Sequence, residues 1–282
     1  MKLLRRIFFP LWKIRARFWV RKRIKEEQEP IRKVASALKD SLKGKLDVEE
    51  KLWVKNIEQL RQELKQNEQE IIVTDFGAGS PNENRTPQEM YTGVVNSTKV
   101  SKVVCASKSP FWSLFLHKLI REFQSEKGLE FGTSLGLSAS YQASAMTING
   151  KGKLITMEGS LSLVEKAVSN FTKIGLINIE TVQGRFSDNL EKVLSQNNPI
   201  DYVFLDAHHD KNATIEYFET LLPYLSDNCI IVFDDIRWSR GMKKAFSLIT
   251  ENPRIRFVFD LKEMGVCILA PENKERVIYK VK

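Results

Sequence analysis

The sequence predicts an α/β protein in which a mainly parallel sheet is covered by helices on both faces. Two observations lead to this fold class. The chain has 282 residues with a hydrophobic content of 42%, which is enough to bury a sizeable core. From residue 128 onward, short apolar runs alternate with stretches of helical pattern, as in sheets built from strand–helix–strand units. The apolar runs lie at 153–157, 177–182, 201–205, 229–234, 255–260 and 264–269, and the helical stretches at about 137–147, 161–173, 186–196, 213–224 and 239–250.

The first 125 residues have a different pattern, which divides the chain into three parts. Residues 1–25 form a basic amphipathic helix, residues 26–125 a mainly helical cap or lid, and residues 126–282 the α/β domain. In the cap, two helices are expected to be separated by a break at Gly44 and Asp47, and a third helix is expected over about 98–107. We interpret the glycine turn at 75–80 as part of a lid and not as a cofactor loop, because the next apolar run ends without an acidic residue.

The formal net charge of +9 is confined to the N-terminus. Residues 1–25 hold ten Lys and Arg and no acidic residue, whereas residues 26–282 hold 34 basic and 35 acidic residues. A nucleic-acid surface would require a basic patch on the folded domain. We therefore expect no nucleic-acid partner, and an anionic partner for residues 1–25 only.

The apolar residues of this basic segment recur three and four positions apart, which places them on one face of a helix. No apolar run approaches the roughly 20 residues of a spanning helix. A helix that lies on the anionic inner face of a membrane and a helix that docks on the core or on a partner both remain open; an organelle transit peptide is disfavoured because the segment has no Ser. The apolar residues are Leu3, Leu4, Ile7, Phe8, Leu11, Trp12, Ile14, Phe18 and Trp19.

The three cysteines, Cys105, Cys229 and Cys267, are odd in number and have no C-x-x-C spacing. This pattern disfavours a disulfide framework and a structural zinc site. We therefore expect a reducing compartment, the cytoplasm.

Ligands of open α/β sheets bind beyond the carboxyl ends of the strands, so the residues that end each apolar run are the candidates for a binding site. The turn after the strand that contains Glu130 carries Gly132 and Gly136, where backbone can approach a ligand and helix N–H groups face an anion. The next strand ends at Glu158, 28 residues beyond Glu130, and a carboxylate at this place can accept both hydroxyls of a ribose. These two strand ends together indicate a nucleoside site.

On these motifs, residues 120–270 resemble the class I S-adenosylmethionine-dependent methyltransferases, within them the small-molecule O-methyltransferases of the catechol and caffeoyl-CoA type. The resemblance implies a Rossmann-like methyltransferase fold with a mainly parallel seven-stranded sheet, and S-adenosylmethionine as cofactor. It implies that the glycine loop holds the methionine portion, that Glu158 binds the ribose, and that the turn 181–186 lies near the adenine. The implied cofactor-binding residues are Glu130, Gly132, Thr133, Ser134, Gly136, Ser138, Glu158, Gly159, Gly184, Arg185, Phe186 and Asp206.

Three carboxylates end the fourth and fifth strands, namely Asp206, Asp234 and Asp235. These strands are neighbours in the expected topology, so the carboxylates could meet at one edge of the cleft and hold Mg²⁺ or another divalent cation. The related enzymes hold a metal with an Asp after strand four and an Asp-Asn pair after strand five, whereas this sequence has Asp235 in place of the Asn. Carboxylates that cap a helix or bond a turn are the alternative interpretation.

The resemblance also implies the general base. The residue three positions after the strand-four aspartate is a lysine in those enzymes and removes the proton of the substrate hydroxyl; here it is His209. A neutral imidazole can accept that proton, so His209 and Asp206 are the expected catalytic residues. His208 is expected to line the cleft or stack on the adenine, and His117 to be structural.

The function that the sequence supports is methyl transfer from S-adenosylmethionine to a hydroxyl of a small acceptor. Two alternatives stay open: a membrane-tethered nucleotide-binding module without turnover, and a nucleotide-dependent oxidoreductase. The second is weakened because a dinucleotide site needs G-x-G-x-x-G, and only Gly132 and Gly136 are present at the turn.

Overall fold

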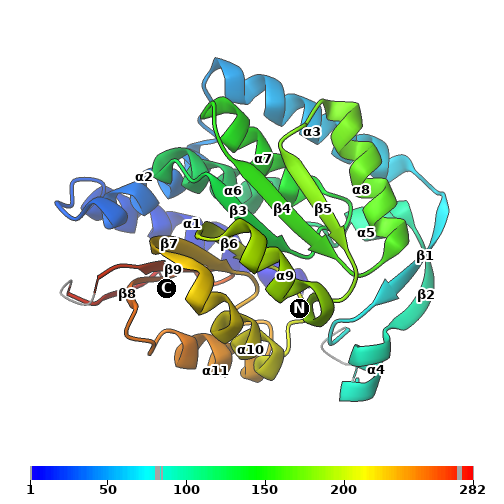
Figure 1. The fold of residues 1–282 in the computed structure, drawn as a ribbon. Coiled ribbons are helices and arrows are strands. Elements are labelled where there is room, and N and C mark those ends of the chain that lie inside the picture. The colour runs from blue at the N-terminus through cyan, green and yellow to red at the C-terminus, as the bar shows by residue number, and fades with distance from the viewer. Residues whose placement is uncertain (1, 80–82, 84, 272–274, 282) are drawn as a thin grey trace.

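The computed structural model describes residues 2–79, 83, 85–271 and 275–281, with the side chains of residues 2–8 left undescribed. Its centre is an eight-stranded sheet in the order β10-β8-β9-β7-β6-β3-β4-β5 (Figure 1). Strand β9 is antiparallel to both of its neighbours, and all other pairs are parallel. The strands are β3 (Lys127–Phe131), β4 (Lys153–Glu158), β5 (Ile179–Gln183), β6 (Ile200–Leu205), β7 (Leu225–Phe233), β8 (Ile255–Asp260), β9 (Gly265–Leu269) and β10 (Val277–Lys280).

The α/β fold class is confirmed, but the expected count of seven strands is wrong. The additional strand is β10, which pairs in parallel with β8 at the edge of the sheet. Its four residues alternate between half-buried and exposed, so they lack the continuous apolar run that marks the central strands.

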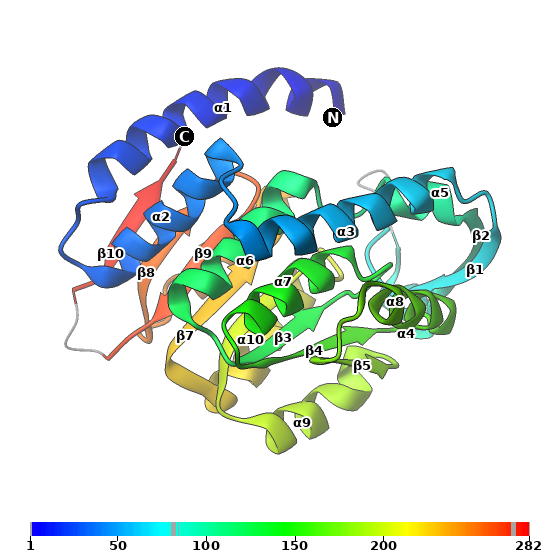
Figure 2. The same ribbon diagram turned by 90° about the horizontal axis from the view of Figure 1, so that it is seen from above.

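Helices cover both faces of the sheet (Figure 2). Side chains from β6 contribute to the layers on both faces of the sheet. Tyr202 and Phe204 belong to the core under α7 and under the helices over residues 2–23, 29–43 and 110–123, while Val203 and Leu205 belong to the core under α9, α10 and α11. This alternation follows from the two-residue period of a strand. The helices of the α/β domain are α7 (Leu137–Ile148), α8 (Leu161–Ile174), α9 (Phe186–Asn197), α10 (Lys211–Leu221), the short 3₁₀ turn η1 (Leu222–Tyr224) and α11 (Arg240–Ile249).

The N-terminal helix α1 (Lys2–Arg23) docks on the edge of the domain that carries β8 and β10 (Figure 2). Trp12, Ala16 and Val20 are buried in the core, and the Trp12 indole N–H donates to the carbonyl of Val281 at 3.0 Å. The Trp19 ring packs edge-on against Phe259. One face of α1 is therefore docked on the core, which is one of the two interpretations that the sequence left open. The side chains of Leu3, Leu4, Ile7 and Phe8 lie outside the described part of the structure.

The expected cap helices are present as α2 (Glu29–Lys43) and α3 (Val48–Gln66). Gly44 ends α2 in the left-handed conformation with φ of 60°, and Asp47 opens α3 with a capping box in which Glu50 is the partner. The expected break is thus confirmed. Helix α6 (Pro110–Phe123) packs between α2 and α7, while α3 packs directly against α7.

A short antiparallel ribbon interrupts the helical cap. It consists of β1 (Glu70–Asp75) and β2 (Val94–Lys99), with α4 (Pro87–Thr92) between them and α5 (Val100–Val104) after them. The helix expected over 98–107 is therefore shorter than predicted, because its first residues belong to β2. In both figures the ribbon lies beside α8, at the end of the sheet formed by β4 and β5.

No helix in the described part of the chain is long and apolar enough to cross a membrane.

Candidate active site

The loops that follow β3, β6 and β7 contain unusual backbone conformations. Four residues other than glycine have φ between 46° and 60° there: Ser134, His208, His209 and Asp235. Each such residue costs about 1–3 kcal/mol, and backbone strain of this kind concentrates at functional sites. Since β3, β6 and β7 are adjacent in the sheet, the strained residues lie along one edge.

The glycine loop after β3 is held close to the next strand ends. The Gly132 N–H donates to the Met157 carbonyl at 2.9 Å, and its φ is 91°. A Cβ atom at Gly132 would lie 2.3 Å from the Asp206 carbonyl oxygen, so only glycine fits. Thr133 anchors the loop through a buried contact of its hydroxyl with that of Thr156 at 2.6 Å.

The second glycine of the loop, Gly136, opens α7 with φ of 79°. A Cβ atom there would lie 2.5 Å from the Phe171 ring, so this glycine is required for packing of α7 against α8. Ser138 follows within the first turn of α7 and is buried. The loop and the start of α7 thus form a compact backbone surface at the end of β3.

Glu130 lies beneath this loop and is fully buried. The Thr156 hydroxyl and the Gln142 amide each donate to its carboxyl group at 2.7 Å. Burial raises the pKa of Glu130 to about 7, although hydrogen bonds from Thr156, Ser138 and Gln142 lower it. Glu130 therefore supports the glycine loop from its buried side.

Glu158, at the end of β4, joins the glycine loop to the loop after its own strand. Its two carboxylate oxygens accept the backbone N–H groups of Ser134 at 2.9 Å and Ser160 at 3.0 Å. Burial raises the pKa of Glu158, although these N–H groups lower it. Each carboxylate oxygen retains a second acceptor position, so the group is oriented and still able to accept ligand hydroxyls.

The glycine turn of the cap reaches this part of the site. A Cβ atom on Gly159 would lie 2.5 Å from the Phe76 ring, and the Ala78 N–H donates to the His208 carbonyl at 2.9 Å. Asp75 accepts a hydrogen bond from Arg85 at 2.7 Å. Residues 75–79 thus contact two loops of the sheet edge; Ser80, also part of the predicted turn, lies outside the described residues.

The turn after β5 contributes Gly184, whose N–H donates to the Glu158 carbonyl at 2.9 Å. The Arg185 guanidinium pairs with Asp188 at 2.8 Å and lies 4.1 Å from the Tyr91 ring centroid. Phe186 is buried against the Phe131 and His208 rings. The structure therefore turns Arg185 toward α4 and places Phe186 in the core next to the site.

The two histidines after β6 have different surroundings. His208 Nδ1 lies 3.0 Å from the Tyr217 hydroxyl, and burial lowers the pKa of this histidine. His209 lies against the Trp238 ring, and its Nε2 is 3.7 Å from Asp206 Oδ1. His208 is thus held within an aromatic cluster, whereas His209 stands beside the acidic strand ends.

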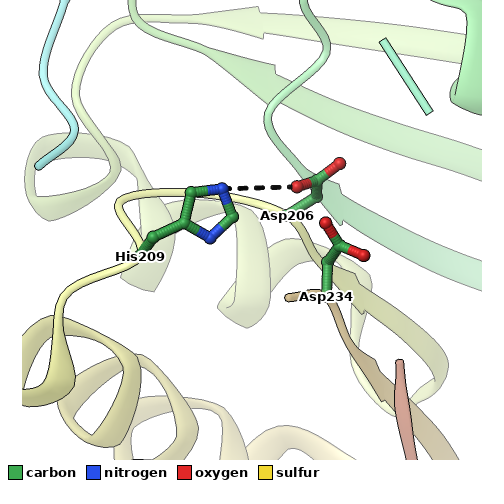
Figure 3. A group of neighbouring side chains, drawn as sticks. All are labelled: Asp206, His209 and Asp234. Carbon is green, nitrogen blue, oxygen red and sulfur yellow. Dashed lines mark ion pairs between the residues drawn. The ribbon is translucent and has the colours of Figure 1, made fainter. Parts of the chain in front are cut away.

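Figure 3 shows Asp206, His209 and Asp234 converging from the ends of β6 and β7. One potential ligand atom from each of the three lies within 4.8 Å of the others. Asp234 is 2% exposed, while Asp206 and His209 are half-buried. The convergence of Asp206 and Asp234 agrees with the sequence prediction. The third member of the group is His209, whereas the sequence predicted Asp235.

A fourth side chain, Lys108, enters this group and was not predicted. Its ammonium group pairs directly with Asp234 and lies 3.5 Å from Asp206 Oδ2. Burial lowers the pKa of Lys108, but the charges of Asp206, Asp234 and Asp235 outweigh it and raise the pKa above the ordinary value. Lys108 lies 126 residues before Asp234 in the sequence, so no local sequence pattern could predict this contact.

The arrangement does not fit the divalent cation that the sequence suggested. The carboxylates that would bind the ion already hold the Lys108 ammonium group. A divalent ion about 4 Å from an ammonium group would be repelled by about 8 kcal/mol at an effective dielectric constant of about 20. We therefore derive no chemical step from a metal ion.

Comparisons with known proteins agree with this architecture. Residues 129–236 match a protein family described as a methyltransferase domain. A catechol O-methyltransferase from Niastella koreensis is 31% identical over 143 residues, which cover 50% of this chain and 63% of that enzyme. The match thus spans less than two thirds of the relative.

Solved structures share the fold. An O-methyltransferase from Bacillus cereus in complex with SAH has a TM-score of 0.51 and 24% identity, covering 60% of this chain and 85% of its own. An SAH-bound methyltransferase from Podospora anserina has a TM-score of 0.52 and 19% identity, covering 60% and 81%. The solved structures show a shared fold, and the sequence matches make residues 129–236 similar to methyltransferase domains, among them that of a catechol O-methyltransferase.

Proposed function

We propose that this protein transfers the methyl group of S-adenosylmethionine to a hydroxyl group of a small molecule. The observation that carries the proposal is the Glu158 carboxylate, which backbone N–H groups of the glycine loop and of Ser160 hold in one orientation at the strand end. An oriented carboxylate next to a half-buried glycine loop suits a ribose that carries a further polar group. The match of residues 129–236 to a methyltransferase domain supports the same cofactor.

The residues present fit this cofactor. Glu158 would bind the ribose hydroxyls, and the loop 132–134 would hold the methionine portion through its backbone. When bound, S-adenosylmethionine supplies a methyl group already activated by the positive sulfur. The protein then has to orient the acceptor and exclude water, which are major sources of acceleration in such a transfer.

His209 is the proposed general base. Its ring is held between Trp238 and Asp206, at the same edge as the glycine loop. The His209 imidazole would accept the proton of the acceptor hydroxyl, and the nearby Asp206 carboxylate would stabilise the resulting imidazolium. This assignment follows the prediction made from sequence, with Asp206 acting as a positioning residue.

Binding calorimetry with S-adenosylmethionine tests the cofactor assignment. Replacing Glu158 with Ala removes charge-assisted hydrogen bonds worth about 1.5–3 kcal/mol, so affinity should fall by about ten- to over one-hundred-fold. Glu165→Ala, on the exposed side of α8, is the matched control and should bind normally. Equal affinity in both variants would remove the assignment of Glu158 to the cofactor site, and tighter binding of NAD than of S-adenosylmethionine would remove the methyltransferase proposal.

Release of S-adenosylhomocysteine with a panel of small hydroxyl acceptors separates an enzyme from a binding module without turnover. Cofactor binding with no product for any phenol, catechol or aliphatic alcohol tested would favour the binding module. The cytoplasm is the proposed compartment, in keeping with three cysteines that are all free, of which Cys229 and Cys267 are buried.

We also infer that α1 lies against an anionic membrane surface. Its outward face exposes Leu11, Ile14 and Phe18, which are 53%, 49% and 59% exposed. Arg15 and Lys22 flank this apolar stripe and are exposed as well. Such a face suits the headgroup region of a membrane that contains anionic lipid, where each basic residue adds about 1 kcal/mol.

Co-sedimentation with phosphatidylserine vesicles tests this inference. The triple variant Leu11→Ser, Ile14→Ser and Phe18→Ser keeps the buried face of α1 and should lose most vesicle binding. Binding of the wild-type chain to neutral phosphatidylcholine vesicles should be weak. Equal sedimentation of wild type and variant would contradict the membrane inference and would mean that α1 serves only to pack against the domain.

A further inference from the structure

Lys108 comes from outside the matched methyltransferase domain. It lies in the short connection between α5 and α6, whereas its carboxylate partners end β6 and β7. The ammonium group contacts Asp234 directly and lies 3.5 Å from Asp206 Oδ2. The cap therefore supplies a positive charge to the chemical centre of the sheet edge.

The start of α6 fixes the position of this lysine. Ser109 caps the helix by accepting the Trp112 backbone N–H, and the Trp112 indole N–H donates to Glu263 at 2.6 Å. The Ser113 hydroxyl donates to the Lys108 carbonyl at 3.4 Å. Trp112 is 2% exposed and packs in the core beneath the sheet. The backbone at Lys108, four residues before it, is therefore held in a fixed position relative to the sheet.

The lysine uses the same groups that a divalent cation would use. Asp206 and Asp234, together with His209, are the described residues whose ligand atoms come within 4.8 Å of one another. Asp234 is almost completely buried, so its carboxylate needs a positive or hydrogen-bonding partner within the protein. The Lys108 side chain, 13% exposed, is that partner.

We propose that the Lys108 ammonium group replaces the divalent cation in this site, so that the protein neither binds nor requires a metal ion. The fixed charge balances the carboxylates and helps to orient the acceptor, and proton removal stays with His209. This inference rests on the proposed function for its effect on turnover. Its effect on metal binding is independent of that function.

Electron paramagnetic resonance of Mn²⁺ tests the metal part directly, because binding removes the signal of the free ion. The wild-type protein and the control Lys102→Ala, an exposed lysine on α5, should leave the free signal unchanged. Lys108→Met removes the charge and keeps the length of the side chain, so it should reduce the free Mn²⁺ signal at concentrations at least about tenfold below any at which the wild-type protein has an effect. Adding Asp234→Asn to Lys108→Met should abolish the gained site.

Two results would overturn the proposal. One is Mn²⁺ binding by the wild-type protein that Asp234→Asn removes, because the carboxylates would then accept a metal with the lysine present. The other is a folded Lys108→Met variant that binds no Mn²⁺. Should Lys108→Met fail to fold, Lys108→Arg gives the comparison, since it retains the charge and should remain free of Mn²⁺.

Turnover provides a second readout. Formation of S-adenosylhomocysteine by the wild-type protein should be unchanged in EDTA and should not rise with added Mg²⁺. Loss of turnover in EDTA that Mg²⁺ restores would contradict the inference while confirming methyl transfer. Failure of S-adenosylmethionine to bind would instead contradict the proposed function and leave the Mn²⁺ result standing.

Discussion

The sheet and the cap bring their groups to the same site by different routes. The sheet places Glu158, Asp206 and Asp234 at the ends of neighbouring strands, where the parallel topology alone gathers them. The cap contributes Phe76 and Lys108 from loops that reach the sheet edge through packing of distant segments. The sheet therefore gathers its carboxylates by topology, while the cap adds the Lys108 charge and the Phe76 ring by tertiary packing.

The largest expected effect lies on the sheet side of this comparison. Replacing His209 with Ala should reduce turnover by about 10²–10⁴-fold, which is the usual contribution of a general base, and should leave S-adenosylmethionine affinity nearly unchanged. Steady-state kinetics and calorimetry on the same preparation measure the two quantities. Wild-type turnover in this variant would leave orientation of the acceptor as the main source of catalysis.

The next effect concerns the N-terminal helix α1, and the quantity measured is the stability of the fold. Trp12 is 2% exposed and bonds to Val281, so Trp12→Ala should lower the free energy of unfolding by about 3–5 kcal/mol. Leu11→Ala, one residue away on the exposed face of α1, should change it by less than about 0.5 kcal/mol. Urea denaturation compares the two. Equal midpoints would mean that α1 does not belong to the folded unit.

These differences explain what the sequence could and could not predict. The positions of Asp206, Glu158 and His209 follow local rules, since each is at a fixed offset from an apolar run. Lys108 has no such offset: its partners depend on how α6 packs against the sheet. Strand β10 escaped prediction for a similar reason, because its short, half-exposed sequence becomes a strand only beside β8.

A smaller effect is expected from the ion network that ties α3 to α6. Glu50 is buried, with Lys118 Nζ at 2.5 Å and His117 Nε2 at 3.3 Å from its carboxylate. Burial raises the pKa of Glu50, but hydrogen bonds from His117 and Lys118 outweigh it and lower the pKa from 4.5 to about 2. The carboxylate therefore stabilises the fold above pH 4.5, and this contribution is lost as the pH falls toward 2.

The loss should amount to about 2 kcal/mol by about pH 3. Urea denaturation at neutral and acidic pH measures it as the difference between wild type and Glu50→Gln, which cannot ionise at this position. The variant should be less stable than wild type at neutral pH and should lose less on acidification. Parallel pH profiles for the two proteins would show that the pKa of Glu50 is the same in the folded and unfolded chain.

The smallest effect tests whether the cap forms a wall of the cofactor site. The Phe76 ring is half-buried and packs on Gly159, directly after the proposed ribose ligand Glu158. Phe76→Ala removes this aromatic surface, which is worth about 0.5–1.5 kcal/mol, so S-adenosylmethionine affinity should fall by about two- to tenfold. Ile72→Ala, an exposed position on β1, provides the control for a general effect on the ribbon. Calorimetry measures the S-adenosylmethionine affinity of both variants. A loss of affinity in Phe76→Ala but not in Ile72→Ala would place the segment 75–79 in the binding site, whereas equal affinities would mean that the cofactor does not contact this segment.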